Sequence, residues 1–396
     1  MSPYNGTGAF MVGIRQLVFF LLLLPAAVAG QSAPSTPQAA APPPISAEEK
    51  KKLDGSLLAA VEHGDRTRMQ QLLTQGADPN ARDEHGVTAL MKAAEDMDPA
   101  LARMLIAAGA DVNAKDAVGT TALLTASDDG SPEVLRLLLA HRADVSASDN
   151  NGWNAIIFAA DAHRTDLVRI LLGTAANYLK QDKNGTSALM IAAAGDDPAT
   201  VIALLDAAQR ADRLAAGKQP AGAQSQLRLM LDARDLRGWT ALHHAASRGV
   251  QRTVRILLAR SAKPNATDNS GTTPLLLAAE TGDPGTVQAL LARHADPNAA
   301  SPNGNTPLIQ AADAGNTEAV QLLLAHGAHA NARARDGRTA LMEAAVGGHT
   351  AIVEILLQKG ADPNARMANG ASVLARASAR PQNEQVIDLL KQAGAK

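Results

Sequence analysis

Two histidines and two acidic pairs are the side chains of this 396-residue sequence best suited to chemistry. His243-His244 has the residue type that binds zinc, and Asp128-Asp129 and Asp196-Asp197 could supply paired carboxylates for acid–base catalysis. Adjacent residues on a helix point about 100° apart, so the two imidazoles cannot share one metal ion. Each aspartate pair lies near a predicted helix end, where solvated acids are common. We therefore predict no metal site and no catalytic residues.

Other chemistry is excluded by composition and by missing motifs. The sequence has no cysteine, which rules out disulfides, thiolate zinc sites and cysteine nucleophiles. No phosphate-binding glycine-rich loop, no G-x-S-x-G elbow and no H-E-x-x-H pair occurs. The net charge is −2 without a basic stripe, which argues against a nucleic-acid partner. The sequence therefore predicts a protein that is not an enzyme and needs no cofactor.

The sequence contains an internal repeat, and any binding site must be built from its units. Residues 334–365 show its unit in full, and a glycine near the start of the unit recurs every 33 residues, with one interval of 53. A fixed period of this size is the signature of stacked repeats, in which each unit contacts only its neighbours. The lead glycines are Gly86, Gly119, Gly152, Gly185, Gly238, Gly271, Gly304, Gly337 and Gly370.

Each unit has the signals of a tight turn followed by two helices. An Asp-x-x-Gly sequence leads into the turn, and a threonine such as Thr339 is placed to cap the first helix. Alanine pairs such as Ala344-Ala345 allow neighbouring helices to approach closely. The second helix has apolar residues at the spacing of Val320, Leu323 and Leu324, and a glycine such as Gly360 then ends it in the left-handed conformation.

This unit resembles the ankyrin repeat, and the resemblance covers residues 53–396. The Thr-Pro-Leu-His motif of that family appears at Thr240 to His243, and its Gly-Ala-Asp-x-Asn ending appears at Gly360 to Asn364. The resemblance implies an all-α repeat fold: an ankyrin-repeat solenoid of about ten helix-turn-helix units with hairpin loops, over residues 46–396. It also implies that the imidazole of His243 bridges neighbouring loops.

The middle of the array is expected to be its least stable part. Four units lack the glycine that ends the second helix, and we expect the replacing residue to adopt the left-handed conformation at a cost of roughly 1 kcal/mol. The interval of 53 places twenty extra residues at about 206–232. Residues 207–216 continue a helix-compatible pattern and residues 217–223 are expected to form a loop. As a whole we expect the insertion to be a tolerated surface loop, or alternatively a finger that contacts a partner. The residues that replace glycine are Arg142, Ala175, Ser261 and His294.

Residues 1–29 have the pattern of a cleaved signal peptide. Arg15 precedes a short apolar run from Leu17, and Ala27-Val28-Ala29 gives a small-residue cleavage site before Gly30. An uncleaved anchor or a translation start at Met11 remain as alternatives. Residues 30–45 are rich in proline and alanine and are expected to form a linker. The sequence thus predicts an exported protein, periplasmic or secreted, with no membrane insertion after cleavage.

The resemblance implies that the hairpin tips and the exposed ends of the first helices bind a partner protein. In the second to fourth repeats, which begin near Gly86, these positions are mostly acidic, and in the fifth and sixth repeats they are basic. Two tryptophans follow lead glycines on either side of the insertion; they are binding anchors or ordinary packing residues. The predicted partner-binding residues are Glu84, Glu95, Asp96, Asp128, Asp129, Trp153, Asp161, Lys183, Arg237, Trp239 and Arg248.

The sequence therefore predicts a non-enzymatic scaffold, expected to be a monomer, that binds a protein through its concave groove. Two alternatives stay open. The protein could be an accessory factor or subunit of an enzyme of the cell envelope. It could also be a secreted effector that acts on host proteins.

Overall fold

The computed structural model describes residues 46–128, 130–216, 224–380 and 383–396. Residues 46–396 form one unit, separate from residues 1–45. The predicted signal peptide (1–29), the linker (30–45) and Asp129 therefore lie outside the described residues. The described part contains 21 helices and no strand beyond four isolated bridges, which confirms the all-α fold class.

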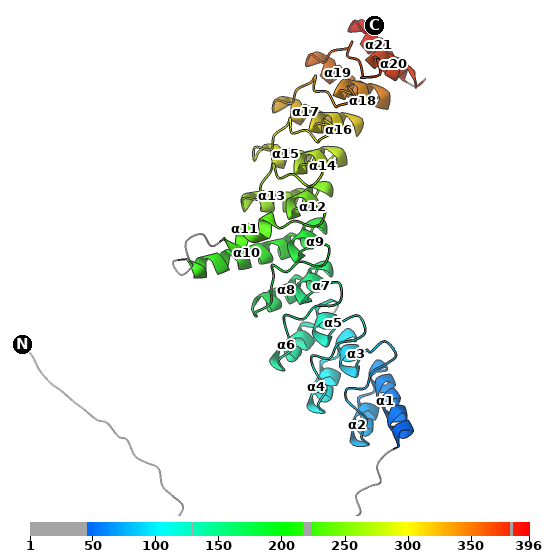
Figure 1. Cartoon of the computed structure of the whole chain (residues 1–396), viewed down its shortest axis with the longest axis vertical. Coiled ribbons are helices and arrows are strands. Elements are labelled where there is room, and N and C mark those ends of the chain that lie inside the picture. Colours follow the sequence, from blue (N-terminus) through cyan, green and yellow to red (C-terminus); the bar gives the residue numbers. More distant parts are fainter. Residues whose placement is uncertain (1–45, 129, 217–223, 381–382) are drawn as a thin grey trace, which may run out of the picture. The chain divides into compact units, whose positions relative to one another are not determined.

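The helices stack as successive antiparallel pairs, each pair beside the next (Figure 1). The first helices of the pairs pack against one another and form one layer. They are α1 (Ala47–Glu62), α3 (Ala89–Glu95), α5 (Ala122–Asp128), α7 (Ala155–Asp161), α9 (Ala188–Ala194), α12 (Ala241–Ser247), α14 (Pro274–Thr281), α16 (Pro307–Asp313), α18 (Ala340–Gly347) and α20 (Val373–Ser378).

The second helices form the other layer. They are α2 (Arg66–Thr74), α4 (Pro99–Ala107), α6 (Pro132–Ala140), α8 (Thr165–Leu172), α10 (Pro198–Ala215), α13 (Gln251–Ala259), α15 (Pro284–Leu291), α17 (Thr317–Ala325), α19 (Thr350–Gln358) and α21 (Glu384–Gln392). One further helix, α11 (Gln226–Asp232), belongs to the insertion. None of the helices in the described ranges has the length and apolar character that a membrane span requires.

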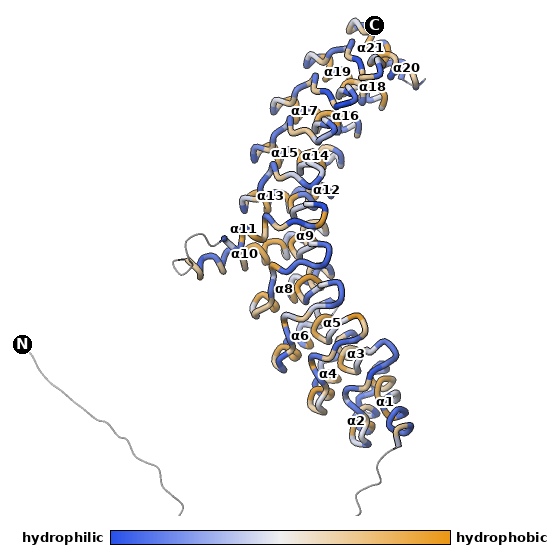
Figure 2. Tube along the Cα trace, viewed as in Figure 1, coloured by the Kyte–Doolittle hydropathy of each residue, from blue (hydrophilic) through white to orange (hydrophobic). Residues whose placement is uncertain are grey.

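The capping threonine, the alanine pair and the apolar residues of the second helix have the structural roles predicted from the sequence. The hydroxyl of Thr339 accepts a hydrogen bond of 3.3 Å from the Met342 N–H and so caps α18. The alanine pair of this helix is completely buried between neighbouring helices. In α17, Val320 and Leu323 are buried. Apolar segments therefore lie on the helices and hydrophilic segments on the loops that join the pairs (Figure 2).

In four units another residue replaces the glycine after the second helix. Three of these residues adopt the predicted left-handed conformation. Arg142, Ser261 and His294 have φ angles of 64°, 68° and 61°, in the left-handed region. The prediction for Ala175 is wrong, because this residue has no positive φ. Instead, the Thr174 hydroxyl donates to the Leu171 carbonyl at 2.6 Å and accepts from the Ala176 N–H at 3.1 Å. That side chain satisfies the helix end without a left-handed residue.

A ladder of asparagines joins the loops after the second helices. Each asparagine donates to a carbonyl of the next unit and accepts from an N–H two residues further on, as Asn298 does with Gly327 and His329. We call this set the asparagine ladder. Ser146, Leu179 and Asp232 occupy the same position in three consecutive units and make neither bond. The ladder consists of Asn80, Asn113, Asn265, Asn298, Asn331 and Asn364.

The insertion is helical in its described part, and the helix-compatible pattern predicted for residues 207–216 is confirmed by α10. Helix α10 is 18 residues long and projects beyond the second helices of neighbouring units, and α11 packs beside it (Figure 1). Asp212 of α10 accepts hydrogen bonds from the Ser225 hydroxyl and the Gln226 N–H, both at 2.6 Å. Met230 and Leu231 of α11 are buried in the core. Residues 217–223 lie outside the described ranges.

Candidate protein-binding groove

The hairpin between consecutive pairs is shaped by its aspartate and its lead glycine. The Oδ1 of Asp83 accepts hydrogen bonds from the N–H groups of His85 and Val87, both at 2.9 Å. Gly337 has a φ of 85°, and a side-chain carbon there would come within 2.8 Å of the Ala368 nitrogen. Only glycine fits this position without displacing the next hairpin.

The hairpin tips are joined into a row by backbone hydrogen bonds. The Lys183 N–H donates to the Asn151 carbonyl at 2.9 Å, and the Arg237 carbonyl accepts from the Asn269 N–H at 3.0 Å. The row continues past the insertion, because the Leu236 N–H donates to the Asn184 carbonyl at 2.9 Å. The row is interrupted at Pro302, because proline has no backbone N–H to donate to the preceding hairpin. Tip side chains of different repeats are therefore held at fixed spacing.

The structure places the predicted charged residues at these tips and at the ends of the first helices. Glu84, Lys183 and Arg237 are exposed at hairpin tips, and Asp128 is the last residue of α5. Asp129 lies outside the described residues. The exposed residues at the ends of first helices are Glu95, Asp96, Asp161 and Arg248.

One hollow of about 270 Å³ brings two of the predicted residues together. Asp161 at the end of α7 and Arg248 at the end of α12 both line it. His163, His244 and the apolar Met190 and Ile191 complete much of its wall. The acidic and basic ends of the predicted surface therefore meet at the fourth to sixth repeats, where an apolar floor lies between opposite charges.

Both tryptophans are half-buried and make the same contact with the next repeat. The indole N–H of Trp153 donates to Oδ2 of Asp182 at 3.1 Å, and that of Trp239 donates to Oδ2 of Asp268 at 2.9 Å. The Arg237 guanidinium lies 4.1 Å from the centre of the Trp239 ring, within cation–π distance. The N–H groups are thus used in packing between repeats, while part of each ring is exposed to solvent.

The two histidines have separate structural roles. The ring nitrogens of His243 lie 2.9 Å from the Thr240 hydroxyl and 3.2 Å from the Thr272 carbonyl of the next hairpin, which confirms the bridging role. His244 contacts Asp235 at 3.1 Å. Burial lowers the pKa of both imidazoles below the ordinary value, against the opposing effect of Asp235 on His244. Among the described residues, no cluster of ligating side chains could hold a metal ion.

Sequence reasoning missed the residue immediately before each alanine pair. This position contacts the hairpin of its own repeat: Phe158 packs edge-on against Trp153, and His244 pairs with Asp235. The residue types are visible in the sequence, but the predicted binding positions on the first helices all follow the alanine pair. A helical-wheel comparison of all repeats would have found this second row of groove residues.

In the ninth repeat this position is Glu343, which is only 6% exposed. Its Oε1 lies 3.7 Å from Arg338 and 3.5 Å from Arg376. Burial raises the pKa of the Glu343 carboxyl, and the two guanidinium groups oppose that effect. Arg338 also pairs with Asp336 at 2.6 Å. The C-terminal end of the groove therefore has a buried cluster of carboxyl and guanidinium groups, unlike the apolar floor near Ile191.

The comparisons with known proteins agree with this geometry. A family model described as Ankyrin repeats (3 copies) matches residues 57–149, 141–216, 213–301 and 276–367. Since these matches cover most of the chain, the protein belongs to the ankyrin-repeat family. Ankyrin repeats generally mediate protein–protein interaction and are typically non-enzymatic modules. No individually curated protein gave a match.

Proposed function

We propose that the protein is an exported scaffold that binds one partner protein through the groove formed by its hairpin tips and first helices. The observation that carries the proposal is the hollow lined by Asp161 and Arg248, because it joins an acidic surface to a basic one across an apolar floor. Opposed charges along one face fix the orientation of a partner and speed its association more than they increase affinity.

The partner is expected to present basic residues to the second to fourth repeats and acidic residues to the fifth and sixth. The exposed parts of the Trp153 and Trp239 rings would supply apolar anchors at the junction, each contributing about 2 kcal/mol of binding free energy. A monomer is sufficient for this mode of binding, because each partner surface meets a single continuous groove.

The experiment is a pull-down from the envelope fraction of the source organism, followed by binding kinetics with the partner recovered. Replacing Asp96 and Asp161 by lysine should slow association and weaken its salt dependence. Glu133→Lys, on the exposed side of α6, is the matched control and should leave association unchanged. Equal effects of the groove and control variants would contradict the proposal.

The tryptophan contribution is tested separately. Trp239→Ala should raise the dissociation rate at least tenfold, whereas Trp239→Phe keeps an apolar ring and should change it little. If both variants dissociate at the wild-type rate, the rings are packing residues only.

Export is part of the proposal and rests on residues 1–29 alone. The mature protein should begin at Gly30, in the periplasm if the source is a Gram-negative bacterium, or outside the cell. N-terminal sequencing of protein from the periplasm or medium tests this. Recovery of the chain in membranes with residues 1–29 retained would support an anchor instead.

A further inference from the structure

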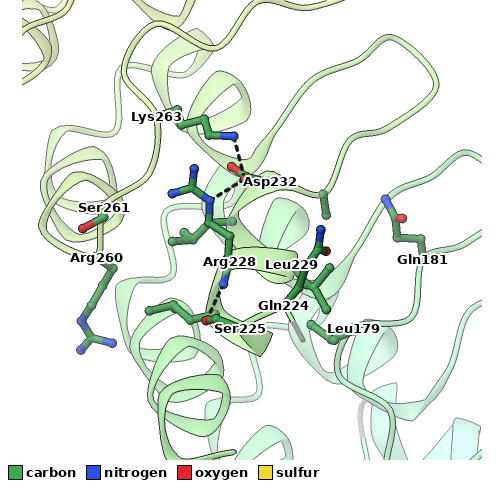
Figure 3. A pocket seen from close by; sticks show the side chains of 13 residues that line it. Leu179, Gln181, Gln224, Ser225, Arg228, Leu229, Asp232, Arg260, Ser261 and Lys263 are labelled. Carbon is green, nitrogen blue, oxygen red and sulfur yellow. Dashed lines mark hydrogen bonds and ion pairs between the residues drawn. The ribbon is translucent and has the colours of Figure 1, made fainter. Parts of the chain in front are cut away.

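The insertion forms one side of a second depression, of about 870 Å³, that shares no residue with the predicted groove set (Figure 3). Its other sides are the loop that precedes α9 and the turn that follows α13. Leu179 and Asp232 line it, and both occupy positions where other repeats have an asparagine of the ladder. The depression thus lies at the interruption of the asparagine ladder.

Within the described ranges, the interruption leaves a backbone donor and a backbone acceptor without protein partners. In the next repeat, Asn265 donates to the His294 carbonyl at 3.0 Å and accepts from the Asp296 N–H at 2.8 Å. The corresponding groups here are the Ser261 carbonyl and the Lys263 N–H, and neither makes a hydrogen bond within the described ranges. A carboxylate cannot donate to a carbonyl, so Asp232 cannot replace asparagine in this pair of bonds.

Asp232 instead holds two cations at the edge of the depression. Its Oδ2 lies 2.8 Å from the Arg228 guanidinium and 2.8 Å from the Lys263 ammonium group (Figure 3). Arg260 also lines the depression and pairs with Asp206 at 2.7 Å. The lining itself therefore has three cations and one carboxylate, while Asp206 and Asp212 contact lining residues without lining the depression themselves. In addition, Nη1 of Arg260 is buried without a hydrogen-bond partner in the described structure.

Apolar side chains complete the lining. Leu229 of α11 is 38% exposed, although most large apolar residues of the array are buried. Leu179 and Leu227 are only partly buried and line the same space. The depression therefore combines an apolar wall, an unpaired backbone donor and acceptor, and an excess of positive charge.

We propose that this depression binds an extended acidic peptide segment of a partner protein. One residue of such a segment can donate its N–H to the Ser261 carbonyl and accept from the Lys263 N–H through its own carbonyl, as in strand addition. A neighbouring acidic side chain would pair with Arg228, and an apolar one would cover Leu229. A simple anion offers no donor for the Ser261 carbonyl, so it uses only part of the site.

The test uses an array of nine-residue peptides in three sets, built from Glu, Leu and Thr, from Gln, Leu and Thr, or from Lys, Leu and Thr. The acidic set should bind, and the tightest peptide should slow amide hydrogen exchange at residues 261–263. Preference for the basic set, or no peptide binding above that of the glutamine set, would overturn the proposal.

Substitutions then locate the binding. Asp232→Asn should complete the ladder, occupy both backbone groups and weaken peptide binding at least tenfold. Asn298→Asp, which makes the reverse change elsewhere in the ladder, should leave affinity within twofold. Leu229→Glu should abolish binding without altering the fold, because its side chain is exposed. Unchanged or tighter binding by either Asp232→Asn or Leu229→Glu would overturn the assignment. A groove variant such as Asp161→Lys should bind the peptide normally. Failure of the groove proposal can therefore be distinguished from failure of the peptide proposal.

Discussion

The indole nitrogen of Trp239 lies 2.9 Å from Oδ2 of Asp268, the lead aspartate of the following hairpin. The other oxygen of that carboxylate, Oδ1, accepts the N–H groups of Ser270 and Thr272 and so shapes the hairpin itself. One side chain therefore holds its own turn and the preceding repeat together. Trp153 makes the equivalent contact with Asp182.

Removing the indole N–H should weaken this coupling between repeats. We expect Trp239→Phe to lower the free energy of unfolding by about 1 kcal/mol, since the ring stays and one hydrogen bond to a carboxylate is lost. The measurement is urea unfolding followed by circular dichroism. Trp153→Phe provides a parallel case and should behave alike. An unchanged unfolding midpoint in both variants would show that the hydrogen bond contributes nothing to stability.

The buried histidines should make the protein less stable as the pH falls from 7.5 towards 5.5. Burial lowers the pKa of His244 in the folded state, so the unfolded chain binds its proton at a higher pH. Stability is therefore fully present above the ordinary histidine pKa and is lost as the pH falls through and below it.

His244→Ile tests this, because isoleucine occupies the equivalent position in the fifth repeat, at Ile191. Its melting temperature should vary less with pH than that of the wild type over this range. Asp235, Arg237 and Arg248 face His244, and they remain in the variant. An identical pH profile in the two proteins would assign the dependence to other groups.

The repeat architecture could be predicted from sequence because every unit repeats its own signals. Lead glycines, capping residues and alanine pairs contact their own unit or an equivalent neighbouring unit, so the same residue types recur in nine copies of the repeat. Ala175 shows the limit of such reasoning. Its neighbour Thr174 satisfies the helix end through a side chain, and a rule based on glycine alone does not consider that solution.

The insertion and the groove floor were harder to predict for a different reason. Helix α11 has no copy elsewhere in the chain, and its capping partner Asp212 lies on the preceding helix. Likewise, the buried carboxyl of Glu343 contacts Arg376 from the next repeat. Such contacts between elements leave no periodic pattern in the sequence. The charged tips and helix ends were placed correctly, but which of them a partner contacts stays a prediction.

The insertion should depend on the cap provided by Asp212. Asp212→Ala removes the acceptor of the Ser225 hydroxyl and the Gln226 N–H, so we expect a local loss of about 1 to 2 kcal/mol and faster amide exchange in α11. Glu133→Ala, at an exposed acid on α6, controls for general loss of charge. Deleting residues 210–227 should also be destabilising, because it removes this cap and the packed Leu227. A deletion variant as stable as the wild type would show that the insertion is a tolerated loop.

The asparagine ladder should determine where the array opens first. Between Asn265 and Asn364 the ladder is continuous, whereas Ser146, Leu179 and Asp232 interrupt it in three consecutive repeats. Because each repeat is coupled only to its neighbours, weaker coupling there should let this region open separately, and unfolding should not be two-state. Hydrogen exchange measured by mass spectrometry should be fastest in α7 to α11 and slowest in α14 to α19. Asn298→Asp should create a new weak junction, costing about 1 kcal/mol, because a carboxylate cannot donate to the Gly327 carbonyl, and should speed amide exchange in the loop that follows α17. Uniform protection along residues 53–396, or no effect of that substitution, would show that helix packing alone sets the stability of each junction.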